Sequence, residues 1–433
     1  MTVTDTDYET ASALSRQMYA RATEVMPGGN SRTAVFTAPY PIYARSGHGC
    51  RVVDLDGVER TDFLGNSTTL LHGHAHPAVV AAVIDAVGRG ASFGLPTATE
   101  VEFAELLAAR SDAFEHVRFT STGTEAVMMA VQAARAYTGR SRVAKLAGAY
   151  HGPYDAVAVN NDGTDSLINH SRSGGVSATA LAETVVIPFN DPEGAVEVLH
   201  RHADALACVL IDPMPWRTGL VAATPEYLAA LRAFCDETGV PLVSDEVGSF
   251  RIGYHGAIDA LGGAADLTVL GKIIGAGLPI GAVAGRREVM AVFDPRGGSP
   301  ALPHSGSYNA NPVSMSAGIA SLNLWSPEEF RRLGVLGGAA RDAMRHVIAE
   351  AGLDWQVNGR ESLFRVLVGP VPGSSASTAQ INLLLYRALL RHGVLVGETG
   401  LGCVSTPMGS AEVEQLRTAF ERAVHDVVTD ARD

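Results

Sequence analysis

The sequence predicts an α/β protein whose larger part is a mostly parallel sheet and whose C-terminal part is a separate α+β domain. Between residues 117 and 285, short β-rich runs alternate with helical stretches such as PEYLAALRAFCDET. Strands that alternate with helices form βαβ units, and the resulting parallel sheet is buried on both faces. After Pro312 the pattern becomes helical and then yields a few further strands.

Each element follows from its local pattern. Helical spacing of apolar residues predicts a helix over 8–25, which Pro27-Gly28-Gly29 ends. The stretch PIYARSGHGCRVVDLDG predicts short strands joined by turns. The expected strands of the large sheet are VRFT, RVAKL, TVVIPF, ACVLI, VPLVSDEV, LTVL and GAVAG, followed later by SLFRVLV and GVLVG. The further expected helices span residues 78–89, 99–112, 124–138, 377–391 and 410–428.

Composition excludes several classes of protein. The chain has 433 residues, of which 46% are hydrophobic and 18% charged, which is typical of a globular protein with a large core. Its 33 basic and 46 acidic residues give a net charge of −13, which argues against nucleic acid or an anionic membrane as partner. The N-terminus, MTVTDTDYET, is too acidic for a secretory signal, and no apolar run reaches the roughly 18 residues of a membrane span.

The four cysteines form no C-x-x-C pair, so we expect neither a zinc site nor a disulfide framework, and no metal site of any kind. This cysteine usage fits a reducing cytoplasm.

Lys272 is one of only two lysines, the other being Lys145, in a chain that otherwise uses arginine for positive charge. It stands in LTVLGKIIGAGLPIG, between an apolar run and a series of glycines. Burial disfavours the charged amine, and a neutral amine is a nucleophile that forms Schiff bases with aldehydes. The alternative is a lysine that extends to the surface, as most lysines do.

A carboxylate follows the strongest apolar strand. Asp245, in VPLVSDEV, is expected at the C-terminal edge of the sheet, where the active sites of parallel sheets lie. A carboxylate there suits a protonated pyridine nitrogen, the partner that pyridoxal phosphate needs as an electron sink. Strand-end carboxylates also bind metals or cap loops.

Two further stretches suit the same cofactor. In FTSTGTEAVMM, Thr122, Gly123 and Thr124 stand at a helix N-terminus, where backbone N–H groups bind phosphate. The alternative is an ordinary N-cap. In GAYHG, Tyr150 offers a ring for stacking, although a core tyrosine explains it equally well. The order of these signals, with Lys272 27 residues after Asp245, predicts a pyridoxal phosphate site.

The sequence also resembles the class III aminotransferases, in the branch of glutamate-1-semialdehyde aminomutase and the β-phenylalanine type of β-amino acid aminotransferase. The resemblance runs over nearly the whole chain, through MPGGNSR, GHAHPAV, FTSTGTEAVM, AGAYHG, VSDEV, LGKIIGAGLPIGAVAGRREVM and HSGSYNANPVSMSAG. It implies the fold type I architecture of pyridoxal phosphate enzymes, with a seven-stranded sheet in the large domain. The implied division is 1–61 and 319–433 for the small domain and 62–318 for the large one.

The resemblance also implies roles for individual residues. Thr122, Gly123 and Thr124 bind the cofactor phosphate. Tyr150 and Val247 lie on the two faces of the ring. Asp245 pairs with the ring nitrogen, and Lys272 forms the Schiff base and moves the proton.

Two implied roles reach beyond the cofactor. Ser307, in HSGSYNANP, reaches the phosphate of a partner subunit, so a homodimer with shared sites is expected. Arg32, in GGNSR, holds the substrate carboxylate, for which a surface arginine near a turn is the alternative.

Three departures from the family pattern concern the substrate. Glu398 and Thr399 stand where a Pro-Arg pair grips the co-substrate carboxylate in relatives, so the bidentate clamp is missing. Trp216 and Arg217, in IDPMPWRTG, are new and belong either to the substrate pocket or to a solvent-facing loop. Gly248 replaces a larger residue and is expected to enlarge the site.

Three functions are compatible with these residues. The first is an aminotransferase that moves an amino group from an amino acid or amine, with its carboxylate on Arg32, to a keto or aldehyde acceptor. The second is an isomerase: an aminomutase, racemase or epimerase. The third, a non-catalytic cofactor-binding protein, is disfavoured because Lys272 and Asp245 are both present.

Overall fold

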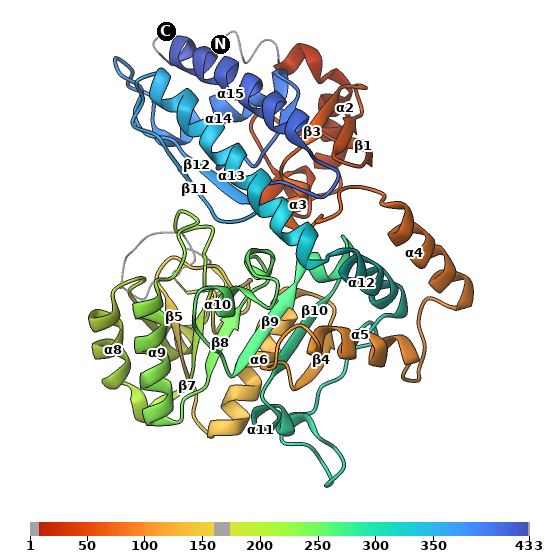
Figure 1. Cartoon of the computed structure of the whole chain (residues 1–433), viewed down its shortest axis with the longest axis vertical. Helices are drawn as coiled ribbons and strands as arrows, with labels where there is room; N and C mark the ends of the chain where they lie inside the picture. Colours follow the sequence, from red (N-terminus) through yellow and green to blue (C-terminus); the bar gives the residue numbers. More distant parts are fainter. Residues whose placement is uncertain (1–7, 160–173, 432–433) are drawn as a thin grey trace. The chain divides into compact units, whose positions relative to one another are not determined.

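The computed structural model of the protein describes residues 8–159 and 174–431 (Figure 1). Contacts between residues divide the chain into two compact units. One consists of Met1–His76 together with Arg331–Asp433, and the other of Pro77–Phe330. These boundaries lie after residues 76 and 330, whereas the sequence-based division places them after residues 61 and 318.

The unit Pro77–Phe330 is built on a seven-stranded sheet with strand order β4-β10-β9-β8-β7-β5-β6. Neighbouring strands from β6 to β9 pair in parallel, whereas β10 pairs antiparallel with both of its neighbours, β9 and β4. The predicted α/β class with a mostly parallel sheet is therefore confirmed. The strands are β4 His116–Thr120, β5 Arg142–Leu146, β6 Thr184–Ile187, β7 Leu206–Ile211, β8 Leu242–Asp245, β9 Leu267–Gly271 and β10 Gly281–Gly285.

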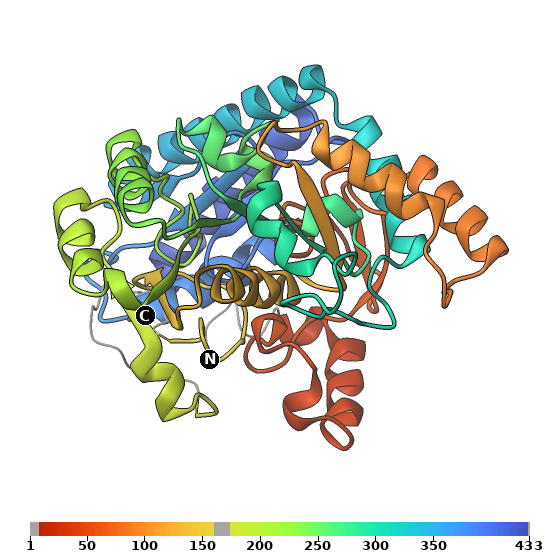
Figure 2. The same cartoon turned by 90° about the horizontal axis from the view of Figure 1, so that it is seen from below.

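Burial on both faces explains why these runs are continuously apolar. Every residue of β6, β7, β8, β9 and β10 is buried. Helix α6, Gly123–Thr138, packs on β7, β9 and β10 and lies across the sheet in Figure 2. It buries small residues such as Ala126, Ala130 and Ala134. Its first residue lies beside the end of β4, so the fold delivers this helix N-terminus to one edge of the sheet.

The other helices of this unit form two groups (Figures 1 and 2). Helices α8 and α9 pack against each other, and α12 packs against α4 and α5. Short helices α7, α10 and α11 complete the unit. The bounds are α4 Pro77–Arg89, α5 Ala98–Ala108, α7 Ala178–Glu183, α8 Pro192–His200, α9 Pro225–Thr238, α10 Ala257–Ala260, α11 Arg287–Met290 and α12 Pro312–Leu324.

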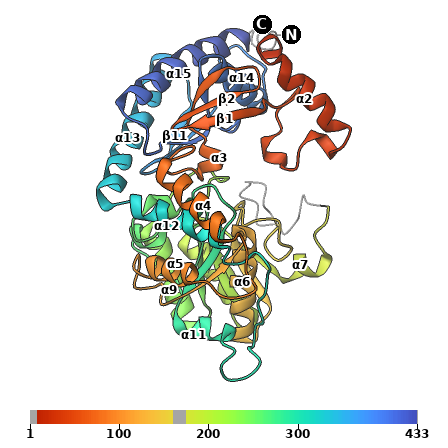
Figure 3. The same cartoon turned by 90° about the vertical axis from the view of Figure 1, so that its right-hand side faces the viewer.

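The other unit joins segments from the two ends of the chain. Strand β13, Val394–Leu395, pairs in parallel with β3, Glu59–Asp62, which completes the sheet β1-β2-β3-β13. In Figure 3 the strands β1 and β2 lie between α2 and the helices α13 and α15. The remaining bounds are α2 Ala13–Thr23, β1 Ala44–His48, β2 Arg51–Asp54, α3 Gly65–Thr68, α13 Pro327–Glu350, β11 Gln356–Asn358, β12 Leu363–Leu367, α14 Thr378–Arg391, β14 Leu401–Cys403 and α15 Ser410–Asp430.

Within residues 8–159 and 174–431, no helix combines the length and apolarity needed to cross a membrane. The four cysteines are all buried, and none of them forms a disulfide in the structure.

Lys145 has a structural task in the large sheet. It lies on β5 and is fully buried, and its Nζ donates to the carbonyls of Ala149, Val157 and Val159 at 2.7, 3.2 and 2.7 Å. A buried ammonium is tolerated when its three donors are satisfied in this way. The lysine therefore fixes the chain segment that follows β5.

We predict that Lys145→Met costs about 3 kcal/mol of unfolding free energy, because three buried carbonyls lose their donor. Urea unfolding measures this loss. The control is Arg142→Met on the same strand, a half-buried position whose guanidinium contacts His202, for which we expect a loss below about 1 kcal/mol. Equal losses in the two variants would contradict the assignment.

Candidate active site

The ends of three parallel strands bring distant residues to one edge of the sheet. The register pairs Ile211 of β7 with Ser244 of β8, and Asp245 of β8 with Val269 of β9. Asp212 therefore follows β7 at the level of Asp245, and Lys272 follows the last residue of β9. This is the edge at which parallel α/β sheets carry their ligand sites.

Lys272 leaves β9 in a strained conformation. Its φ of 48° lies in the left-handed region, which costs a residue other than glycine about 1–2 kcal/mol. The side chain is half-buried, and the next residues form the short 3-10 helix η5, Lys272–Gly275. Apart from the two chain neighbours of Gly248, Lys272 is the one described residue within 4 Å of the place a Cβ would take on this glycine, with its Nζ at 3.6 Å. Gly248 thus leaves open space in front of the amine.

Asp245 is a buried carboxylate held from two sides. His151 Nδ1 donates to its Oδ2 at 2.7 Å, and the backbone N–H of Val247 donates to its Oδ1 at 3.1 Å. Burial lowers the pKa of His151, and the hydrogen bond to Asp245 opposes that shift. A neutral imidazole that donates through Nδ1 leaves Nε2 as an acceptor, and this buried atom has no partner among the described residues.

Glu246, the neighbour of Asp245, has a structural role. Its Oε1 accepts hydrogen bonds from Ser244 Oγ at 3.1 Å and from the backbone of Ile258 at 3.0 Å. It thereby caps the N-terminus of α10, and burial raises the pKa of its carboxyl to about 7. Of the two consecutive carboxylates, Asp245 is therefore the one available to a ligand.

Asp212 is a second buried carboxylate that the sequence analysis did not single out. Its Oδ1 accepts hydrogen bonds from the backbone N–H of Met214 at 2.9 Å and from Ser249 Oγ at 3.1 Å. Burial, together with the charge of Asp245, raises the pKa of Asp212 to about 7. The available signal was the apolar run ACVLI directly before it, the same pattern that pointed to Asp245.

The N-terminus of α6 lies at the same edge. Thr122 is the N-cap, and its side chain accepts from the backbone N–H of Glu125 at 3.1 Å. A Cβ on Gly123 would come within 2.8 Å of Val247 Cγ2, so this position requires glycine. A Cβ on Gly152 would likewise come within 2.6 Å of Thr124 Oγ1, so Gly152 packs closely against Thr124. The helix start, Val247 and the segment after β5 therefore converge, with the first N–H groups of a 16-residue helix pointing outward.

Tyr150 and Arg217 stack on each other. The guanidinium carbon of Arg217 lies 4.3 Å from the centre of the Tyr150 ring and 5.1 Å from that of Trp216. Tyr150 is 38% exposed, which excludes the core-tyrosine interpretation. Trp216 and Arg217 are half-buried, so they do not form a fully solvent-facing loop. The cation covers part of the aromatic surface next to His151.

Ser307, the residue predicted to reach a partner subunit's phosphate, lies in the unit Pro77–Phe330 and is exposed. The segment around it is held close to the start of α6, because Ser121 Oγ hydrogen-bonds with Asn309 Oδ1 at 3.1 Å. Asn309 Nδ2 also contacts His304 Nε2 at 3.0 Å.

Three predicted substrate residues belong to the other unit. Arg32 is exposed. Glu398 is half-buried, accepts a hydrogen bond from Thr37 Oγ1, and adds to the burial that raises the pKa of Tyr386 to about 12. Thr399 is exposed, and its carbonyl accepts from Arg365 Nε at 3.2 Å.

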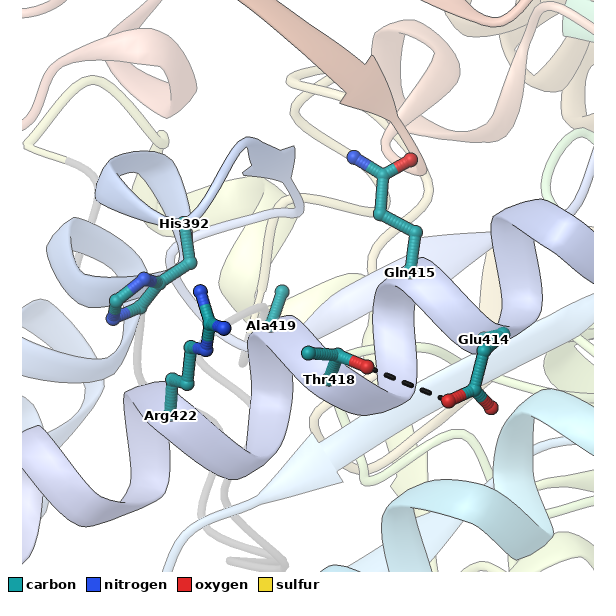
Figure 4. Close-up of a pocket in the computed structure, with 6 residues that line it drawn as sticks. All are labelled: His392, Glu414, Gln415, Thr418, Ala419 and Arg422. Carbon is teal, nitrogen blue, oxygen red and sulfur yellow. Dashed lines mark hydrogen bonds between the residues drawn. The ribbon is translucent and has the colours of Figure 1, made fainter.

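A pocket of about 280 Å³ also lies in this unit, on α15 next to the end of α14 (Figure 4). None of the predicted site residues lines it. Its lining is His392, Glu414, Gln415, Thr418, Ala419 and Arg422.

Comparison with known proteins identifies the family. Residues 33–424 match the model of the family described as aminotransferase class-III. The chain belongs to the class III aminotransferases. Members of this family use pyridoxal phosphate and act on small amino compounds.

Individual class III relatives carry two kinds of name. Glutamate-1-semialdehyde 2,1-aminomutase of Methanothermobacter thermautotrophicus is 34% identical over 95% of this chain and 98% of its own. The β-phenylalanine transaminase of Variovorax paradoxus is 34% identical over 95% of this chain and 92% of its own. A solved transaminase with pyridoxal phosphate bound is 62% identical, with a TM-score of 0.96 over 98% of this chain and 99% of its own.

The raised pKa of Asp212 gives a prediction for stability. A carboxyl whose folded pKa exceeds its unfolded value stabilises the protein at low pH, and this contribution is lost as pH rises through about 7. Asp212→Asn keeps an oxygen for both donors and never ionises. Relative to the wild type, we expect the variant to gain on the order of 2–3 kcal/mol between pH 5 and pH 8. Unfolding at both pH values measures this, and a pH-independent difference would refute it.

Proposed function

We propose that the protein is a pyridoxal phosphate-dependent aminotransferase that moves an amino group from an amino acid or amine to a keto or aldehyde acceptor. The observation that carries this proposal is the meeting of Lys272, Asp245 and the α6 N-terminus at one edge of the sheet. These are an amine, a carboxylate and an anion site. They match the aldehyde, the ring nitrogen and the phosphate of the cofactor.

The residues present fit this cofactor. The start of α6 offers backbone N–H groups and two threonines, Thr122 and Thr124, for the phosphate. Gly248 leaves space in front of Lys272 Nζ, and Val247 offers an apolar surface beside it. Tyr150 is exposed, and Arg217 stacks on it. When bound, pyridoxal phosphate supplies an electron sink that makes proton removal from the carbon bearing the amino group feasible.

The chain's own residues supply binding and proton transfer. Asp245, held by His151 and the Val247 N–H, would present its carboxyl group to the ring nitrogen. His151 in turn orients the carboxylate through Nδ1. Lys272 Nζ would hold the aldehyde carbon of the cofactor until the substrate amine takes its place. The released Nζ would then accept a proton from the substrate carbon and return it at another position.

The substrate contacts extend the proposal. Arg32 binds the carboxylate of a β-amino acid-like donor, and Trp216, Arg217, Glu398 and Thr399 shape specificity. The inverted charge at Glu398 disfavours a carboxylate beside it and favours a cationic group. We propose a cytoplasmic location, which suits four buried cysteines that form no disulfide.

We predict that Lys272 carries the cofactor. The full-length protein is loaded with pyridoxal phosphate, reduced with borohydride, digested and analysed by mass spectrometry. The added mass is expected on the peptide that contains Lys272, and Lys272→Ala should abolish it. Lys145 is the internal control, because its Nζ is fully buried and donates to three carbonyls. Label on Lys145 alone would overturn the assignment.

An isomerase is the second candidate, because a relative named as an aminomutase is as similar to this chain as the one named as a β-phenylalanine transaminase. The loaded protein is incubated with one amino acid and no acceptor. An aminotransferase releases one equivalent of keto product per bound cofactor and then stops. An isomerase instead converts the amino acid over many turnovers without releasing keto product, and that result would replace the leading proposal.

The proposed assembly is a homodimer in which Ser307 reaches the partner's phosphate site. An apolar stripe on α4 supports it, since Val80, Ile84 and Val87 lie on one helix face and are 39%, 67% and 51% exposed. Phe93 and Leu95, in the segment that follows α4, are also exposed, at 50% and 77%.

We predict that Ile84→Asp converts the protein from dimer to monomer, because a buried charge without a partner opposes association. Size-exclusion chromatography with light scattering measures the mass. Val335→Asp is the control, since Val335 is 77% exposed on α13 of the other unit. A dimer that survives Ile84→Asp, or a monomeric wild type, would contradict this interface.

A further inference from the structure

Asp212 is a buried carboxylate with no role in the mechanism above. It is 5% exposed and follows β7 at the level of Asp245, which is 4% exposed. Two carboxylates placed side by side in a buried position repel each other. A neutral asparagine would accept the same two hydrogen bonds from Met214 N–H and Ser249 Oγ. The hydrogen bonds therefore do not explain why the side chain is an acid.

The groups that face Asp212 define its electrostatic surroundings. Asp245 ends the neighbouring strand β8 at the level of Asp212, and its charge raises the pKa of Asp212. His151 Nδ1 donates to Oδ2 of Asp245. Ser249, 1% exposed, faces Asp212 from the loop after β8. Lys272 follows β9, on the other side of β8 from β7, at the same edge of the sheet. Its charge favours the ionised form of Asp212.

Two other cations near this edge are already engaged. Arg217, in the loop that Asp212 begins, stacks over Tyr150. Lys145, on the neighbouring strand β5, donates to three carbonyls. The charge of Lys272, by contrast, acts on the ionisation of Asp212.

We propose that Asp212 is a positioning residue whose negative charge raises the proton affinity of Lys272 Nζ. The coupling is reciprocal: if the lysine charge favours ionised Asp212, then ionised Asp212 favours the ammonium form of the lysine by the same free energy. In the proton transfer, Nζ accepts the proton through its lone pair and becomes an ammonium ion, which the negative charge of Asp212 stabilises. The role in catalysis rests on the proposed function, whereas the coupling between the two side chains does not.

Ionisation of Asp212 near neutrality makes this effect depend on pH. Above about pH 7 the carboxylate is charged and Lys272 holds its proton more tightly. Below that pH the carboxyl is neutral and the effect disappears. Removal of Ser249 Oγ withdraws one hydrogen bond from the charged form, so Ser249→Ala should weaken the effect without abolishing it.

The composition of the chain makes the coupling measurable. Lys272 and Lys145 are its only lysines. Reductive methylation of the full-length, cofactor-free protein with ¹³C-formaldehyde labels accessible amines, and the pH dependence of the Lys272 methyl signal gives the pKa of that amine. The α-amino group gives a separate signal, and Lys272→Arg identifies the lysine signal by its loss.

We expect Asp212→Asn to lower the pKa of Lys272 by roughly one unit, as expected for loss of a nearby opposite charge. Asp212→Glu restores the charge and should return the value to that of the wild type. Asp236→Asn, on α9 with a side chain that is 67% exposed, removes the same charge from the surface and should change nothing. An unchanged or raised lysine pKa in Asp212→Asn would overturn the proposal.

A second arm separates this inference from the proposed function. The visible absorption of the pyridoxal phosphate-loaded protein is titrated with acid and base for the same variants. Asp212→Asn should shift the titration to lower pH, and Asp212→Glu should reverse the shift. If the methylation result holds but the loaded protein shows no lysine-bound cofactor, the proposed function fails and the coupling stands. If the cofactor binds Lys272 normally and neither titration moves, the coupling fails alone.

Discussion

The parallel register of β7, β8 and β9 is the constraint on which the rest of this site depends. It sets Asp212, Asp245 and Lys272, which are far apart in sequence, at the ends of adjacent strands. The register is fixed because all residues of these strands are buried, so a slip would change the packing of apolar side chains on both faces of the sheet. Helix α6, packed on β7, β9 and β10, adds its N-terminus to the same edge.

Charge is concentrated at this edge, and each charged group is held in a different way. Asp245 accepts hydrogen bonds from His151 and the Val247 N–H. Glu246 caps α10. Asp212 accepts hydrogen bonds from two neutral donors, the Met214 N–H and Ser249 Oγ. Burial raises the pKa of Asp212 and Glu246 to about 7, so their proton occupancy changes near neutral pH. The polar groups at this edge are therefore preorganised for a charged ligand, so that binding requires little rearrangement of side chains or solvent.

The sheet and much of the candidate site could be predicted because their signals are local. An apolar run followed by Asp245, a Ser/Thr/Gly turn before α6 and a lysine among glycines are each readable in a short window. The proximity of Asp212 to Asp245 could not be predicted from the sequence, because it depends on β7 lying next to β8 in the sheet. The stack of Arg217 on Tyr150 and the three carbonyls around Lys145 depend on loop paths that no short window encodes. The roles of Arg32, Glu398 and Thr399 stay predictions.

The central claim is that this edge of the sheet is the cofactor site, and a crystal structure of the protein with pyridoxal phosphate tests it most directly. The account predicts the phosphate on the N–H groups at the start of α6, the ring nitrogen within hydrogen-bonding distance of Asp245, and continuous density from Lys272 Nζ to the cofactor. Cofactor bound elsewhere, or bound here with Asp245 turned away from the ring nitrogen and no link to Lys272, would contradict it.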